Sequence, residues 1–322
     1  MGTYIFAAPS GTTDYVVLDN PVADISVGDD NTFQIQTTTK VKPRSLVGVP
    51  GTPFGGIVDE VESSSNSPEY TLKGRTWPGV LSDCVVMPPA GKTNLTASGT
   101  VDSCAKAILS AANWPFGVQW KDETNEVYDI TINRFVTAKD AIDMLMSLIR
   151  KGTNGYEITT SKQTVRLSPV FHSYSSSTIS IVSRYDGAQV TRTETTPSVN
   201  HLIGLGSGEG TARQICHRYI GRDGEITSTK YYTGPDERTA TYDINNDSGS
   251  KLIADTEKKL KEYIKPDVVE IKTPSGLDSG IHIGTRVAVF PDDLRYFTVV
   301  VTGGVFKLDA SGNETVTWTA KI

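Results

Sequence analysis

The sequence predicts a mainly β protein with an α/β insert. At 322 residues the chain is too long to fold around one ordinary hydrophobic core and is long enough for two or three domains. Its 29 Gly and 16 Pro accompany short apolar runs, which is typical of many short strands joined by turns. Alternating apolar and polar residues dominate both ends, whereas helical spacing dominates the middle. We therefore predict a first small β-barrel at residues 1–91, an α/β domain inserted at 92–172 and a second small β-barrel at 173–322.

Short alternating strands fill the first predicted domain. From Phe33 to Gln36 every second residue is apolar, which predicts a strand with one face buried and the other exposed to solvent. Two further half-buried strands are expected at 51–59 and 70–81. Several such strands in a short segment need closure or a partner sheet to hide their edges, and a small barrel supplies both.

Two helices are predicted in the insert. The first begins after Thr100, whose side chain can cap it, and Pro115 stops it. Its apolar face recurs at a spacing near 3.6 residues and comprises Cys104, Ala105, Ile108, Leu109 and Ala112. The strands of the insert are expected at 128–135, 156–160 and 165–167.

The second helix of the insert has signals at both ends. Thr137, with Asp140 three residues later, is an N-terminal capping signature. Arg150 and Lys151 suit the negative end of the helix dipole, and Gly152 suits the exit. The buried stripe comprises Ala138, Ile142, Leu145 and Ile149.

Strands return after the insert, joined by tight turns. Asp186-Gly187 and Asp223-Gly224 mark two turns, because these residue types tolerate positive φ. One long amphipathic helix is expected at about 247–264, laid across the second barrel. The final strands are expected at 268–271, 287–289, 298–308 and 316–322, the last one after a turn at 309–312.

The charge pattern argues against a nucleic-acid-binding surface. The net charge is −6, and Lys and Arg are interleaved with acidic residues without forming a basic block. A surface that grips phosphates needs clustered positive charge. An acidic surface still lets DNA pass without sticking, because like charges repel.

The sequence predicts neither a disulfide framework nor a targeting segment. Cys84, Cys104 and Cys216 are an odd number of cysteines at wide spacing. The N-terminus lacks the basic and apolar regions of a signal peptide, and no apolar run is long enough to span a membrane. We expect synthesis in a reducing cytoplasm.

The glycine-rich segment from Gly204 to Gly210 is the nearest approach to a nucleotide-binding loop. Such a loop needs G-x-G-x-x-G at the start of a helix. Here Glu209 takes the place of the third glycine, its carboxylate would repel phosphate, and no helical pattern follows. A loop or bulge is the expected structure.

The histidines show no catalytic or metal-binding spacing. They are His172, His201, His217 and His282. On a strand, the adjacent Cys216 and His217 point to opposite faces. A Ser-His-Asp or Cys-His site assembled from distant residues stays open, because such sites converge in space and not in sequence.

Two pairs of adjacent carboxylates are expected to be solvated surface. Asp59 and Glu60 fall on a strand, where neighbours face opposite ways, and Asp292 and Asp293 follow a proline in an expected loop. No catalytic residue, no cofactor-binding residue and no metal ligand is therefore predicted, and no cofactor is expected.

Three tryptophans have two interpretations. Trp77, Trp114 and Trp120 would stack on sugars if their rings were exposed. Trp77 is flanked by turn and apolar residues, so we expect it to plug the first barrel. The other two rings are expected to be buried as well.

The two strand motifs of the first domain resemble those of bacteriophage tail hub proteins. This family includes tail-tip proteins of siphophages from Gram-positive hosts and baseplate hubs of contractile-tailed phages. The carrying residues are Gly51-Thr52-Pro53-Phe54-Gly55-Gly56-Ile57-Val58-Asp59 and Gly74-Arg75-Thr76-Trp77-Pro78-Gly79-Val80-Leu81. The resemblance continues at 134–141, 197–206 and 283–289, although Thr285 replaces the usual acidic residue of the last segment.

The resemblance implies a non-enzymatic homotrimer at the virion tail tip. Two barrels per subunit would form a pseudo-sixfold ring that continues and closes the tail tube, with DNA passing through its lumen. The implied partners are a distal tail or tail tube protein, the tape-measure protein, and fibre or receptor-binding proteins. Two alternatives stay open: a tail-associated cell-wall or polysaccharide hydrolase, and a carbohydrate-binding receptor module with exposed tryptophans.

Overall fold

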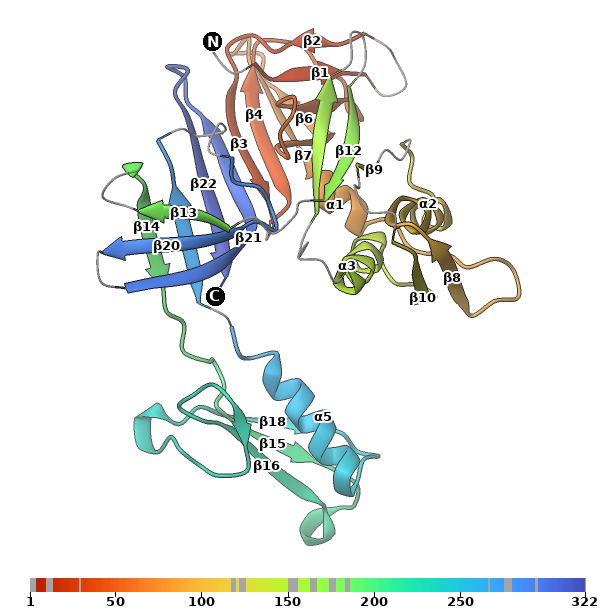
Figure 1. Ribbon diagram of the computed structural model, residues 1–322, viewed down its shortest axis with the longest axis vertical. Helices are drawn as coiled ribbons and strands as arrows, with labels where there is room; N and C mark the ends of the chain where they lie inside the picture. Colours follow the sequence, from red (N-terminus) through yellow and green to blue (C-terminus); the bar gives the residue numbers. More distant parts are fainter. Residues whose placement is uncertain are drawn as a thin grey trace. The chain divides into compact units, whose positions relative to one another are not determined.

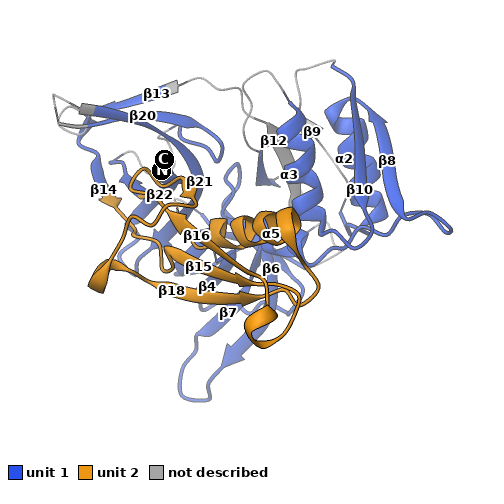
Figure 2. Cartoon of the chain, turned by 90° about the horizontal axis from the view of Figure 1, so that it is seen from below, with its two compact units in different colours: residues 1–191, 269–322 blue, residues 192–268 orange. Residues whose placement is uncertain are grey.

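The computed structural model describes most of the chain as two compact units, residues 1–191 with 269–322 and residues 192–268 (Figure 2). We call these unit 1 and unit 2 and describe each by itself. The structure describes all residues except 1–3, 10–13, 29, 117–119, 122–125, 150–155, 163–166, 174–177, 183–185, 266, 275–279, 293–294 and 322.

One large, mostly antiparallel sheet forms the body of unit 1 (Figure 1). Its strands lie in the order β14 (Gln189–Thr193), β19 (Val268–Lys272), β22 (Glu314–Lys321), β21 (Arg295–Leu308), β3 (Val22–Val27), β4 (Thr32–Thr37), β7 (Tyr70–Thr76), β6 (Gly55–Ser63), β5 (Leu46–Gly48), β1 (Phe6–Ala8) and β2 (Val16–Val17). Off this path, β13 (Thr178–Val182) pairs with β20 (Arg286–Asp292), and β20 pairs with β21.

The large sheet contains an N-terminal group of strands, β1 to β7, and a C-terminal group, β13, β14 and β19 to β22. The long strand β21 joins the two groups. Its first half pairs with β20, and its second half pairs with both β3 and β22. A register shift between Val301 and Gly303 marks the change. A Cβ on Gly303 would lie 2.2 Å from the carbonyl oxygen of Val27, so only glycine allows the strands to approach this closely.

Both groups of strands share one hydrophobic core. Phe54, which lies just before β6, contacts Phe306 and Trp318 at ring-centroid distances of 5.6 and 5.8 Å. No pairing among the described strands closes either group into a barrel, because the path runs open from β14 to β2. The mainly β class is confirmed. The prediction of two separate small β-barrels is wrong, because the described strands of both groups form one open sheet over a shared core. The domain boundaries at 91 and 172 stay predictions.

The α/β part of unit 1 packs around a second hydrophobic cluster, to which Phe6 and Ala8 of β1 and Leu46 of β5 also contribute. Its elements are α1 (Trp77–Ser82), β8 (Asn94–Gly99), α2 (Val101–Ala111), β9 (Trp120–Lys121), β10 (Tyr128–Asn133), α3 (Ala138–Leu148), β11 (Tyr156–Lys162) and β12 (Leu167–Ser173). Both predicted caps are confirmed: Thr100 accepts a hydrogen bond from the Ser103 amide, and Thr137 accepts one from the Asp140 amide. The predicted roles of residues 150–152 lie outside the described residues.

The predicted strand at 70–81 is wrong over its last third. Strand β7 ends at Thr76, and α1 begins at Trp77. Pro78 lies in the first turn of this helix, where its fixed φ suits the helix and its missing N–H costs nothing. Helix α1 buries Trp77, Val80 and Leu81 in the hydrophobic cluster of the α/β part.

Unit 2 is a helix packed on a small sheet. The sheet order is β17 (Ile226–Thr227), β16 (Ile215–Ile220), β15 (His201–Leu205) and β18 (Thr239–Asp243), and two short 3₁₀ turns, η1 (Gly210–Ala212) and η2 (Gly234–Asp236), connect the strands. The predicted helix is confirmed as α5 (Gly249–Lys261), but it packs on β15 and β16 and not across a barrel. Leu202, Ile220 and Leu260 form the buried core.

Glycine lets α5 approach β15 closely. A Cβ on Gly204 would lie 2.0 Å from the hydroxyl oxygen of Thr256, and a Cβ on Gly206 would lie 2.7 Å from a methyl of Leu252. Thr256 is fully buried and donates to the Leu252 carbonyl at 2.6 Å. Gly204 and Gly206 thus serve helix–strand packing.

Gly204→Ala is expected to lower the free energy of unfolding of unit 2 by roughly 1–3 kcal/mol, because the added methyl overpacks the interface. Adding Thr256→Ala should recover part of this loss, since it removes the atoms that the methyl meets. Urea unfolding followed through the NMR signals of unit 2 measures both effects, with Thr256→Ala alone as the control. Additive costs in the double variant would contradict this packing.

Candidate functional site

A groove of about 880 Å³, lined mainly by polar and charged residues, crosses β21, β3, β4, β7 and β6 in unit 1. The alternation in these strands buries residues such as Ile25 and Ile35 and leaves Asp24, Gln34 and Lys307 on the exposed side. Because β21 comes from the C-terminal group and the other four strands from the N-terminal group, the groove exists only where the two groups share a sheet.

Charges of both signs are paired along this groove. Lys307 on β21 lies 2.9 Å from Asp24 on β3, its register partner. Arg75 binds both oxygens of Asp59, with Nε–Oδ2 at 2.7 Å and Nη2–Oδ1 at 2.6 Å, and also contacts Asp83. The hydrogen bond to Asp59, followed by that to Asp83, raises the pKa of Arg75 above its ordinary value. Exposed pairs of this kind contribute only about 0–1 kcal/mol each, so they order the surface more than they stabilise it.

The expectation that Asp59 and Glu60 face opposite ways is wrong. Val58 pairs with Gly74 and Glu60 pairs with Lys73, so Asp59 is the extra residue of a β-bulge. A bulge re-aims side chains, and both carboxylates line the groove. Of the other predicted pair, Asp292 ends β20, whereas Asp293 lies outside the described residues.

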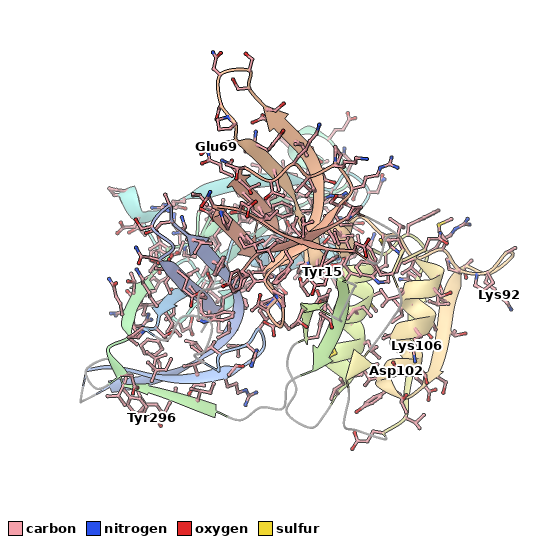
Figure 3. The ribbon with its side chains drawn as sticks, turned by 90° about the horizontal axis from the view of Figure 1, so that it is seen from above. Tyr15, Glu69, Lys92, Asp102, Lys106 and Tyr296 are labelled. Atoms are coloured by element: carbon pink, nitrogen blue, oxygen red, sulfur yellow. The ribbon has the colours of Figure 1, made fainter. Side chains whose placement is uncertain are left out.

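Ion pairs also occupy the outside of the α/β part. Figure 3 shows Asp102 and Lys106 one turn apart on α2, where the carboxylate and the ammonium group are 2.5 Å apart. Lys139 and Asp143 form the same kind of pair on α3 at 2.8 Å. Such pairs stabilise a helix by about 0.2–0.5 kcal/mol.

Unit 2 brings together two histidines that sequence reasoning left apart. On β15, His201 has its Nδ1 2.8 Å from Glu237 and its Nε2 2.9 Å from Nδ1 of His217 on β16. The Tyr219 ring stacks on His201 with the centroids 4.4 Å apart, and Lys230 lies 2.6 Å from Glu237. As predicted, Cys216 and His217 point to opposite faces of the strand; Cys216 is buried and His217 is exposed.

Neighbouring residues within this cluster shift the pKa values of Glu237 and His217. Hydrogen bonds from Lys230 first and then His201 lower the pKa of Glu237. Desolvation first and the neighbouring His201 second lower the pKa of His217. Protonating both rings would break the hydrogen bond between them, because Nε2 of His201 and Nδ1 of His217 would both be donors.

The stability of unit 2 is expected to fall as the pH drops below about 6.5, the ordinary pKa of histidine. The unfolded chain then binds a proton at His217 that the folded unit resists, so this contribution is full above that pH and is lost toward the lowered folded pKa. Urea midpoints of unit 2 signals, measured by NMR across the pH range, test this. His217→Asn should flatten the dependence, and an unchanged slope in that variant would contradict it.

The remaining histidines, His172 and His282, belong to unit 1. The Nδ1 of His282 lies 3.1 Å from Oε2 of Glu157 in unit 1. The backbone of His172 on β12 pairs with that of Glu157. Among the described residues, no group of three or more His, Cys, Asp or Glu side chains is placed to hold a metal ion.

Two of the three tryptophans are buried. Trp77 is 0% exposed and donates from Nε1 to the hydroxyl of Thr160 at 2.9 Å, whereas Trp114 is 8% exposed. These rings are unavailable as sugar platforms. The side chain of Trp120 lies outside the described part of the structure. No helix within the described ranges has the length and apolar character that crossing a bilayer requires.

The fold is similar over its whole length to those of solved phage tail proteins. A tail protein from Neisseria meningitidis has 18% identity and a TM-score of 0.54, with 100% of this chain and 97% of that chain covered. The 43 kDa tail protein of prophage MuSo2 from Shewanella oneidensis has 12% identity and a TM-score of 0.54, with coverage of 99% and 98%. A chain of the phage P2 baseplate, in its activated conformation with Ca, has 10% identity and a TM-score of 0.50, with 98% of each chain covered.

These matches define the fold class: the chain has the fold of phage tail and baseplate proteins. The resemblance seen in the sequence motifs is confirmed at the level of fold. No protein-family model matches the sequence, and no curated protein matches it either.

Proposed function

We propose that this chain is a structural component of a phage tail or baseplate and not an enzyme. The observation that carries the proposal is the full-length similarity, in which 97% or more of both chains is covered for each of two tail proteins and one baseplate chain. Coverage of this extent includes both groups of strands, the α/β part and unit 2. It therefore exceeds what one common β motif would produce.

The finer assignment is a homotrimeric hub at the virion tail tip. In this arrangement the two groups of strands in each subunit, joined through β21, supply the repeated β surface of a ring that continues and closes the tail tube. The ring attaches to a distal tail or tail tube protein, the tape-measure protein, and fibre or receptor-binding proteins. The net charge of −6 suits a lumen through which DNA passes without binding. The division into β domains at 1–91 and 173–322 and an α/β domain at 92–172 belongs to the same proposal.

The association state tests the finer assignment. Native mass spectrometry of the full chain over a range of concentrations is expected to show three copies per particle. A chain that stays monomeric both alone and with its tail neighbours would contradict the hub assignment. The hydrolase alternative predicts lysis zones when the same preparation is run in zymograms of host cell walls, and the proposal predicts none.

A further inference from the structure

Unit 1 contains a second cavity, with a volume of about 470 Å³, within the usual range for ligand pockets. Helix α3 and strands β11 and β21 contribute most of its wall. Much of the lining is apolar, including Met146, Ile149, Ile158, Ile283 and Val300. A ligand with an aliphatic part would lose water on entering this cavity and gain contacts with that lining.

The cavity also holds a buried carboxylate, one oxygen of which lacks a hydrogen-bond partner among the described residues. The Glu157 side chain on β11 is 0% exposed. Its Oε2 lies 3.1 Å from Nδ1 of His282, but its Oε1 is buried without a hydrogen-bond partner among the described residues. A buried carboxylate oxygen left without a donor carries a desolvation penalty, which a charged donor would offset.

No other charged residue in the described lining of this cavity supplies a Lys or Arg partner for Glu157. Asp143 is matched by Lys139 on the same helix at 2.8 Å. Burial first and then Asp143 hold the pKa of Tyr156 well above its ordinary value, so its hydroxyl is neutral. The His282 ring, which contacts Glu157, is 38% exposed. Of the two acidic residues in the described lining, Asp143 has a lysine partner, whereas Glu157 has neither a Lys nor an Arg partner.

We propose that this cavity binds an organic cation, an ammonium or guanidinium group on an aliphatic stem, with the charge against Glu157 and the stem against Met146, Ile149 and Ile158. Such a group supplies the missing donor and the missing positive charge together. A bare metal ion fits less well, because Ca²⁺, Mg²⁺ and Zn²⁺ need four or more ligands and the described residues offer no such group here. The cation is either a free amine or a Lys or Arg side chain from a second copy of this chain.

Titration of the full chain with n-pentylammonium and with n-butylguanidinium chloride tests the proposal by NMR shift changes at Glu157 and Ile158. The wild-type chain is expected to bind at least one of them, and 1-pentanol, which has the stem without the charge, is expected to bind at least about tenfold more weakly. Glu157→Gln keeps the size of the side chain and should weaken cation binding at least about tenfold. The matched control is Glu62→Gln, which changes an exposed carboxylate on β6 paired with Lys73 and should leave binding unchanged.

Two further measurements separate the sources of the cation and guard against misfolding. Ser147→Trp, an exposed cavity-lining position on α3, should block the site sterically without changing charge. If the probe binds and sedimentation velocity shows an unchanged mass, the ligand is a free amine. If the probe or Glu157→Gln lowers the mass, the ligand is a side chain of another copy. A wild-type chain whose shifts and mass respond to neither cation, or a folded Glu157→Gln chain that binds as tightly as wild type, would overturn the proposal.

Discussion

Replacing Trp77 with alanine is expected to lower the free energy of unfolding of unit 1 by about 3–5 kcal/mol. The Trp77 residue is 0% exposed, and its ring packs edge-on against Phe116 with 5.7 Å between the ring centroids. The indole N–H donates a hydrogen bond to the hydroxyl of Thr160. Removing the ring leaves a cavity at the point where β7 turns into α1. Urea unfolding monitored by circular dichroism measures the loss.

Two milder variants separate packing from hydrogen bonding at Trp77. Trp77→Phe keeps much of the buried area and should cost less than Trp77→Ala. Thr160→Val keeps the shape of Thr160 and leaves the indole N–H without its acceptor, which should cost about 1–3 kcal/mol. Near-neutral values for all three variants would contradict the placement of this ring.

Replacing Phe54 with alanine is also expected to cost about 3–5 kcal/mol. Phe54 is 0% exposed and touches Phe306 and Trp318, so its ring joins the N-terminal strands to β21 and β22. If the two groups share one core, the variant should still unfold in a single step that includes signals from both groups. NMR signals of β4 and β22 followed through the same urea titration measure this.

The control for Phe54 is Phe54→Leu, which keeps most of the volume and should cost less than about 1.5 kcal/mol. Separate unfolding of β4 and β22 in the wild-type chain would mean that the two groups have independent cores, as the two-barrel prediction implied. Coincident transitions would fit the shared core around Phe54.

Local signals in the sequence located the helices well. Thr100 and Thr137 are caps because their hydroxyls accept from amides three residues later, and both the residue types and the spacing are visible in the sequence. The start of α1 was missed, although Thr76 followed two residues later by Pro78 was a usable signal for a helix start.

Long-range features could not be predicted in the same way. The shared core depends on Phe54 meeting Phe306 and Trp318, and no periodicity encodes contacts between such distant segments. The histidine pair depends on the register of β15 with β16, and the common side of Asp59 and Glu60 depends on a bulge. Both arise only when strands pair, so a single sequence leaves them undetermined.

Electron cryo-microscopy of purified phage particles, carrying an affinity label on this chain, tests the central claim most directly. The account predicts the label at the end of the tail, in a ring of three copies with density matching unit 1. Intact tails that lack the label, or a label bound elsewhere on the particle, would contradict it.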